Sequence, residues 1–329
     1  MTLLFGLLKT PALCNESCRC LVEIVSKGMR PMEKLYLIQF LNIVEVMGQL
    51  EAGDVDFAEN VGKLANATAV ELKAIWADKD PATTAEAHAT ACALIEQLMP
   101  LLLRFLAHEY DNVSSTVFPA ISDILSVFKK LQKEGTGLTE TQQGFLAQLL
   151  PVLVEKLKYD EGYPWPLPGE SHAVDNDGSL DEDDEEVMFG ELRRNLRVFI
   201  DAIGQIAPGL YDSVVLTTAH NIFKQCSQYG VSAERAADAD GDGQGQLGWV
   251  RAELGVYLAQ AYGERLSTIK GLRFAGTKSG AHPPNGSSTM ASQASTDALA
   301  ELMTVMIQSG IVSCVHPAIA PTFFENCVR

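Results

Sequence analysis

Apolar residues recur at intervals of three and four over most of this chain, with polar residues between them. The segment that begins at Asp111 is an example, and its apolar positions are Val113, Val117, Ile121, Ile124, Leu125 and Phe128. Such spacing places one apolar stripe along an α-helix. No segment forms a credible β-hairpin, so the pattern predicts an all-α protein.

Helices are expected in nearly every part of the chain, joined by short turns. The predicted ranges are about 2–8, 16–27, 31–47, 54–76, 81–109, 111–133, 139–159, 181–207, 210–226, 249–266, 296–308 and 317–328. Boundary residues support several of these. Pro31 suits a helix start and Asp54 an N-cap, Gly28 suits a C-cap, and Pro208 ends one helix where the next begins. Pro100 should kink its helix.

Three stretches interrupt the helical pattern and are predicted to be surface loops, at about 161–184, 232–248 and 276–294. The first combines Pro, Gly and acidic residues. Six consecutive carboxylates, Asp181 to Glu186, close it, and they lie in and before the first turn of the next helix. Negative charge at that end of a helix interacts favourably with the helix dipole.

The order of the helices points to a repeat architecture. Consecutive helix pairs follow one another at intervals of about 40 to 50 residues, which is typical of HEAT repeats. We therefore predict that residues 1–329 form one HEAT-like α-α superhelical solenoid of the ARM type. The alternative is an irregular all-α bundle, because no strict sequence repeat is visible.

Composition and charge restrict the ligands and the cellular compartment that can be expected for this chain. The chain has 329 residues, 47% of them hydrophobic, and a formal net charge of -17. An acidic field repels phosphates, so any contact with RNA requires a local basic face. The seven cysteines form no even disulfide framework and favour a reducing compartment. No apolar run approaches the roughly 20 residues needed to cross a bilayer, so no membrane span is predicted.

Sites for metals or catalysis are weakly supported. Asp238, Asp240 and Asp242 match the start of a calcium-binding EF-hand loop, but Trp249 stands where its closing Glu is needed. Cys14 and Cys18 share a helical face, which predicts burial and not zinc binding. No nucleophile or phosphate-loop motif is present, so we predict a protein that is not an enzyme and has no catalytic residues, metal or cofactor.

Basic residues cluster in only a few places, among them the end of the helix before the acidic loop, with Lys156 and Lys158. Two of the clusters are the candidate RNA contacts. They are Arg193, Arg194, Arg197, Lys129, Lys130 and Lys133. The alternative for the arginines is pairing with Glu186, Glu191 or the acidic loop. For lysines near a helix C-terminus, the alternative is a favourable interaction with the helix dipole.

Five segments resemble one known family in its own order. They are LVEIVSKGMRPMEKLYLIQFL, DVDFAENVGKLAN, VEKLKYDEGY, DEDDEEVMFGELRRNLRVFIDAIGQIAPGLY and SGIVSCVHPAIAPTFFENCVR. Together they resemble the exportin-T family of the importin-β (karyopherin) superfamily. The resemblance runs from about Leu3 to Arg329, and it indicates a central piece of a longer solenoid.

The resemblance implies a nuclear export receptor for tRNA. Such a receptor binds tRNA together with the GTP form of the Ran GTPase, contacts nuclear pore proteins and shuttles between nucleus and cytoplasm without membrane attachment. RNA would be recognised through its shape and backbone. The alternative is a HEAT-repeat scaffold or protein-cargo karyopherin without RNA binding, whose Asp181–Glu186 run would hold a basic partner. A calcium-regulated module is a more distant third possibility.

Overall fold

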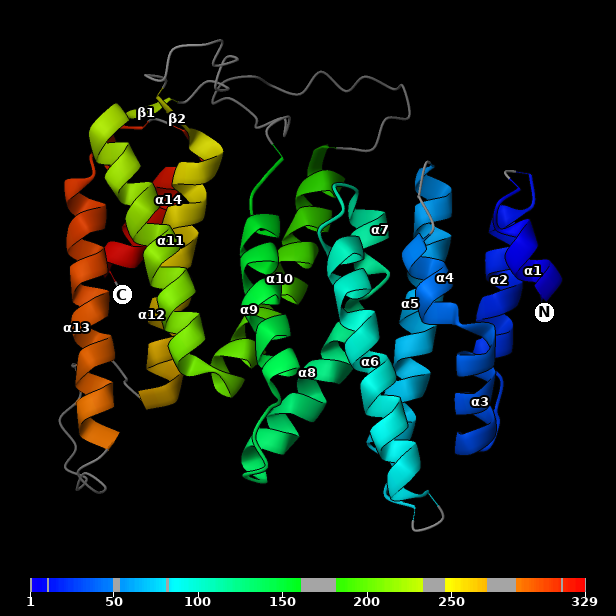
Figure 1. Ribbon diagram of the computed structural model, residues 1–329. Helices are drawn as coiled ribbons and strands as arrows, with labels where there is room; N and C mark the ends of the chain where they lie inside the picture. Colours follow the sequence, from blue (N-terminus) through cyan, green and yellow to red (C-terminus); the bar gives the residue numbers. More distant parts are fainter. Residues whose placement is uncertain are drawn as a thin grey trace. The chain divides into compact units, whose positions relative to one another are not determined.

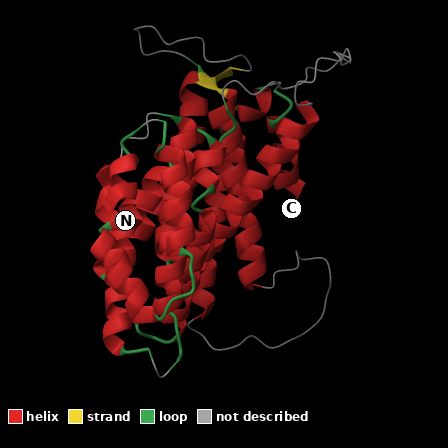
Figure 2. Ribbon diagram, turned by 90° about the vertical axis from the view of Figure 1, so that its right-hand side faces the viewer, coloured by secondary structure: helices red, strands yellow, loops and turns green. Residues whose placement is uncertain are grey.

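The computed structural model describes residues 2–10, 12–49, 54–80, 83–160, 182–232, 246–270, 288–314 and 316–328. The prediction of an all-α fold is confirmed. In chain order the helices are α1 (Thr2–Leu7), α2 (Cys14–Val25), α3 (Pro31–Leu41), α4 (Ile43–Gln49), α5 (Val55–Trp76), α6 (Ala85–Leu106), α7 (Asp111–Ser115), α8 (Phe118–Lys133), α9 (Glu140–Lys156), α10 (Glu182–Ile206), α11 (Pro208–Tyr229), α12 (Trp249–Lys270), α13 (Ser288–Gln308), η1 (Ile311–Ser313) and α14 (Ile319–Val328). Figures 1 and 2 show how completely helix dominates the described residues.

The chain divides into two compact units, which are described separately. Unit 1 consists of Met1–Leu153 with Val198–Ala207, and unit 2 consists of Val154–Arg197 with Pro208–Arg329. Within each unit, consecutive helices lie side by side (Figure 1). This arrangement is the helix-pair packing of repeat proteins, in which each pair buries its apolar faces against neighbours.

In unit 1 the long helix α5 packs against α6 on one side and against α2 on another. Its apolar stripe, which includes Leu64 and Leu72, is fully buried. Gly62 allows a close approach at this helix, because a Cβ there would lie 2.4 Å from Thr116 Oγ1. Trp76 and Phe145 both contact the Phe128 ring edge to face, with centroids 6.3 and 6.4 Å apart.

Local sequence signals define several helix ends in unit 1. Thr139 and Gln142 form a reciprocal capping box at the start of α9, since each side chain accepts the other's backbone N–H at 3.2 Å. At the end of α8, Gly135 has φ +75 and its N–H donates to Gln132 O, while Thr136 N–H donates to Leu131 O. This hydrogen-bond pattern is a Schellman motif, which satisfies the last carbonyls of the helix.

Several predicted boundaries were wrong. The helix before Gly28 already ends at Val25, with Ser26 as its C-cap. The predicted 31–47 helix divides at Asn42, whose left-handed φ of 46 separates α3 from α4. The predicted 111–133 helix divides into α7 and α8 before Pro119, and α13 starts earlier than expected, at Ser288. Helix α6 contains Pro100, as the predicted 81–109 helix does, but it ends at Leu106, three residues before the predicted end.

Other predictions hold or lie outside the described residues. Pro31 begins α3 and Asp54 occupies the N-cap position of α5, although its side chain makes no capping hydrogen bond. Helix α10 ends at Ile206, just before Pro208 as predicted, and α11 begins at Pro208, two residues before its predicted start. Residues 161–181, 233–245 and 271–287, which contain most of the predicted loops, together with Pro81 and Gly53, are not among the described residues.

In unit 2, α11 packs on α12, and α13 and α14 pack against this pair. Gly255 lies in the α11–α12 contact, where an added Cβ would lie 2.8 Å from Ile222 Cγ2. Tyr211 and Tyr262 stack in the same core, with ring centroids 6.1 Å apart. A short parallel pair, β1 (Val231–Ser232) and β2 (Leu247–Gly248), joins the ends of these helices. The sequence had not predicted these strands.

Helix α6 differs from the prediction that no apolar run is long enough for a membrane span. It is the one helix in the described residues that could cross a membrane by length and composition, with a mean hydropathy of 1.4 in its most apolar window. Its buried residues include Leu94, Leu98 and Leu102, and it packs along α5. We therefore interpret α6 as a core helix of unit 1.

Candidate nucleic-acid interface

Arg193 lies inside unit 2 and not on its surface. Its Nη1 and Nη2 donate to the two carboxylate oxygens of Glu253 at 2.8 and 2.6 Å, and its Nε donates to Leu157 O at 2.8 Å. Both side chains are buried, with 10% of the Arg193 side chain and 3% of the Glu253 side chain exposed. This is a bidentate salt bridge, in which two N–H groups of the planar guanidinium donate to the two oxygens of one carboxylate.

Aromatic rings surround the same guanidinium. Its central carbon lies 4.4 Å from the Tyr159 ring centroid, 4.8 Å from that of Phe189 and 4.4 Å from that of Tyr257. Burial by itself lowers the pKa of Arg193, but the hydrogen bonds and charge of Glu253 reverse this effect and raise the pKa overall. Arg193 therefore remains charged, and within unit 2 it connects α10 to α12 and to the segment that follows α9.

This position changes the interpretation of Arg193 as a candidate RNA contact. The pairing alternative named Glu186, Glu191 or the acidic loop, whereas the observed partner, Glu253, lies 60 positions along the chain. Because its donors already bond to Glu253 and Leu157, we interpret Arg193 as a positioning residue that orients α10.

The other two arginines of α10 differ in exposure. Arg197 is largely buried, with 16% of its side chain exposed, and it donates to Ala261 O at 2.9 Å. It also lies 3.6 Å from Glu264. Arg194 is exposed. Of the arginine cluster, Arg194 is therefore the residue best placed to meet a ligand from solution.

The lysine cluster lies at the C-terminal end of α8 in unit 1. Lys130 and Lys133 are exposed and Lys129 is half-buried. Lys130 lies 3.8 Å from Glu134 in an exposed pair, which contributes little stability. Both lysines of the last turn suit the negative end of the helix dipole, and their ammonium groups still face solvent.

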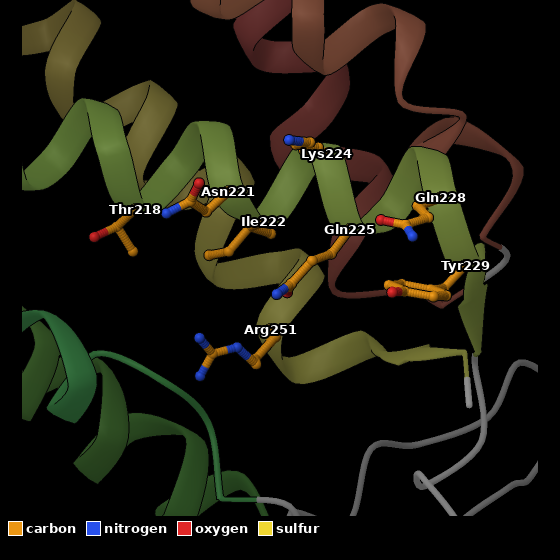
Figure 3. A pocket seen from close by; sticks show the side chains of 8 residues that line it. All are labelled: Thr218, Asn221, Ile222, Lys224, Gln225, Gln228, Tyr229 and Arg251. Carbon is orange, nitrogen blue, oxygen red and sulfur yellow. The ribbon is translucent and has the colours of Figure 1, made fainter. Parts of the chain in front are cut away.

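The structure also forms a polar groove that the sequence analysis missed. It lies in unit 2 between α11 and the first turn of α12, and has a volume of about 420 Å³. Figure 3 shows Arg251 on α12 and the other lining side chains on α11. We call it the α11 groove, and its lining residues are Thr218, Asn221, Ile222, Lys224, Gln225, Gln228, Tyr229 and Arg251.

Local packing explains why these side chains share one groove. Helix α11 ends at Tyr229, the following Gly230 turns the chain with a φ of +74, and β1 then pairs with β2 directly before Trp249. The first turn of α12 is thereby held beside the last turns of α11. A sequence signal was available, because residues 213–233 contain no Asp or Glu in a chain that has 42 of them.

No cluster of three or more His, Cys, Asp or Glu side chains that could hold a metal occurs among the described residues. Asp238, Asp240 and Asp242 lie outside those residues. Cys14 and Cys18 are buried in α2, as predicted, and burial together with the neighbouring Cys14 raises the pKa of Cys18 to about 12.

The described helices pack on one another in sequence order, as they do in all-α helical-repeat proteins, and polar and basic side chains are exposed on them. The chain belongs to the exportin-T family, because the family model described as Exportin-T matches residues 85–329.

Curated relatives agree with this assignment along nearly the whole chain. The chain is 30% identical to Exportin-T of Mycosarcoma maydis over 99% of its own length, and 31% identical to Exportin-T of Laccaria bicolor over 94%. It is 29% identical to Exportin-T of Aspergillus niger over 93%. The chain spans 31%, 28% and 27% of the lengths of these relatives, respectively.

Proposed function

We propose that this chain is a segment of a nuclear export receptor for tRNA. The observation that carries the proposal is membership of the exportin-T family over residues 85–329, together with similarity to the relatives along at least 93% of the chain. The proposed role is binding and transport, with no chemical step catalysed by the chain.

The proposed partners are tRNA, the GTP form of the Ran GTPase and nuclear pore proteins, and the proposed location is the nucleus and cytoplasm, with shuttling through the pore. A helical solenoid suits a folded RNA, because it can present many separate contacts to the shape and phosphates of an A-form helix. The exposed Arg194 on α10 and the lysines at the end of α8 are the proposed contacts from the clusters seen in the sequence.

The negative net charge of the chain opposes RNA binding. With a net charge of -17, the chain as a whole repels RNA at long range, so binding depends on local basic surfaces. The same charge supports a second candidate, a scaffold or protein-cargo karyopherin that binds a basic protein and no RNA.

A salt series with labelled tRNA tests the proposal. We expect binding at about 50 mM salt that weakens as salt rises, because each phosphate contact releases a counterion. The matched competitor is a DNA duplex with a similar number of phosphates, which should compete poorly. Absence of tRNA binding by the folded chain at low salt, both alone and with GTP-loaded Ran, would contradict the proposal and favour the protein-cargo alternative.

A further inference from the structure

We propose that the α11 groove binds the sugar and phosphate backbone of RNA. This inference rests on the proposed function, to which it adds a binding site that no sequence cluster indicated. All of the lining residues belong to unit 2, and two short elements, the end of α11 and the start of α12, supply them.

Charge is the first reason to assign RNA to the groove. Lys224 and Arg251 are both exposed, and none of the eight lining side chains carries a carboxylate. The groove is thus locally basic on a chain whose net charge is -17. A concave basic site attracts phosphate even when the surrounding surface is acidic, because close charges dominate within the screening length of about 10 Å at 0.1 M salt.

The second reason is a stripe of amide side chains along α11. Asn221, Gln225 and Gln228 are all exposed and line the groove at relative positions i, i+4 and i+7. On a helix that rises about 1.5 Å per residue, the stripe extends over about 10 Å, enough for successive nucleotides. An amide both donates and accepts, so it can bond a phosphate oxygen or a ribose 2′-hydroxyl.

Tyr229 supplies a third element at the far end of the stripe. Its side chain is 40% exposed and lies in the groove lining (Figure 3). An exposed aromatic ring offers a stacking surface to an unpaired base. Basic groups alone would accept an acidic peptide equally well, but the ring beside amides and cations matches a base, a ribose and a phosphate. RNA is therefore the ligand that the lining fits best.

One acidic side chain lies close to the groove and gives a sensitive test. Glu155 Oε2 is 3.9 Å from Arg251 Nη1, and both side chains are about half exposed, at 56% and 46%. Such a long, solvated pair is weak, so a phosphate can replace the carboxylate. Removal of the Glu155 charge should consequently strengthen RNA binding.

The first experiment measures binding of a 12-nucleotide oligouridylate and of tRNA to Lys224→Gln/Arg251→Gln. Loss of two phosphate contacts should weaken RNA binding roughly 10- to 25-fold at 0.1 M salt and reduce the slope of log K against log salt by about 1.4 to 1.8. The matched control is Arg19→Gln/Arg30→Gln, two exposed arginines of unit 1 that also form exposed ion pairs. The control should change binding by less than about twofold.

The second experiment uses Glu155→Gln, which should bind oligouridylate severalfold more tightly than the unmodified chain. Glu16→Gln is its control, because Glu16 is 67% exposed and, like Glu155, pairs with a basic residue three positions away. An oligodeoxyuridylate of equal length should bind more weakly than the RNA, since it lacks the 2′-hydroxyls. All the residues substituted in the two experiments are exposed, so the helical content of each variant should equal that of the unmodified chain.

The outcomes separate this inference from the proposed function. If tRNA binds and the groove variants match their controls, the groove assignment is wrong and the proposed function stands. If oligouridylate binds in a groove-dependent manner but tRNA does not bind, the proposed function is wrong and the groove stands. A polyglutamate peptide of equal charge that binds the groove more tightly than oligouridylate would overturn RNA as the ligand, and absence of all RNA binding would overturn both proposals.

Discussion

Arg193 and Glu253 form a buried, two-pronged ion pair that joins α10 to α12 within unit 2, with N to O distances of 2.8 and 2.6 Å. Taking two charges out of water is unfavourable, so the pair is stable only while both partners and their hydrogen bonds are present. Loss of one partner leaves a buried charge with no compensation. The pair therefore makes the stability of unit 2 sensitive to substitution of either of these two buried residues.

Glu253→Gln should lower the free energy of unfolding by about 3–5 kcal/mol, because it leaves the Arg193 charge buried without a counter-charge. Urea denaturation followed by helical circular dichroism measures this change. Arg194→Gln on the exposed face of α10 is the control and should change stability by less than about 0.5 kcal/mol. If Glu253→Gln changed the free energy of unfolding no more than the control does, the Arg193 charge would be accessible to water and the buried pair would be contradicted.

Gly255→Ala should destabilise the contact between α11 and α12. The added Cβ would lie 2.8 Å from Ile222 and 3.1 Å from Phe223, so the helices must separate or these two side chains must shift. Overpacking of this kind lowers stability by about 1–3 kcal/mol. The matched control, Gly209→Ala in α11, meets no atom within 4 Å and should be neutral or stabilising. Equal melting temperatures for the two variants would contradict the close packing.

Stability should fall as the pH is lowered from 7 toward 5, partly because of His316. This ring stacks on Trp249 with centroids 3.9 Å apart, its Nδ1 accepts from Ala318 N–H, and burial lowers its pKa. The unfolded chain therefore binds a proton at a higher pH than the folded chain does. The stabilising contribution is complete above the unfolded pKa of about 6.5 and is lost as pH falls below it.

His316→Phe keeps a stacking ring and removes the titration, so its stability should depend less on pH between 7 and 5 than that of the unmodified chain. Urea midpoints at several pH values measure the difference. The same pH dependence in both proteins would mean that His316 is not protected from protonation.

The cysteines should fall into two classes of reactivity toward a thiol reagent at pH 8. Cys20 and Cys327 are exposed and should react first. Burial raises the pKa of Cys18 and Cys226 to about 12, so both should react only after unfolding. Mass spectrometry of the partly labelled protein identifies the fast sites, and rapid labelling of Cys18 would contradict its burial in α2.

The helical period of the sequence predicted most helices, because an apolar stripe must face a core whatever its partner. The positions at which one predicted helix divides into two were less predictable. Asn42 adopts a left-handed conformation within an otherwise helical pattern, and α7 ends at Ser115, before α8 begins at Phe118. The short β1–β2 pair could not be foreseen, since two residues per strand leave no alternation to detect.

The sequence predicted which candidate residues carry a charge, but it did not predict their burial or their partners. Sequence placed Arg193 and Arg194 side by side, and only the fold separates them into a buried and an exposed side chain. The partner of Arg193 is 60 positions away and belongs to a helix that no local signal connects to α10. The α11 groove likewise depends on α12, which supplies Arg251.

The exposed basic residues should affect RNA binding without affecting stability. Arg194→Gln combined with Lys133→Gln should weaken tRNA binding severalfold and reduce its salt dependence, because exposed cations contribute through counterion release. Unfolding by urea should be unchanged. Glu253→Gln provides the opposite pattern, with a large loss of stability, so the two classes of residue are distinguishable. Unchanged tRNA binding in the exposed variant would remove these two residues from the RNA surface.

The most direct test of the central claim is a hydrogen-exchange footprint of the folded chain with and without tRNA, at low salt and with GTP-loaded Ran present. The account predicts slower exchange at the C-terminal turns of α8 and along α11 near Gln225, and no change in the core of α5. Saturating tRNA that protects no described segment, by a chain of normal helical content, would contradict the claim that this exportin-T segment contacts RNA.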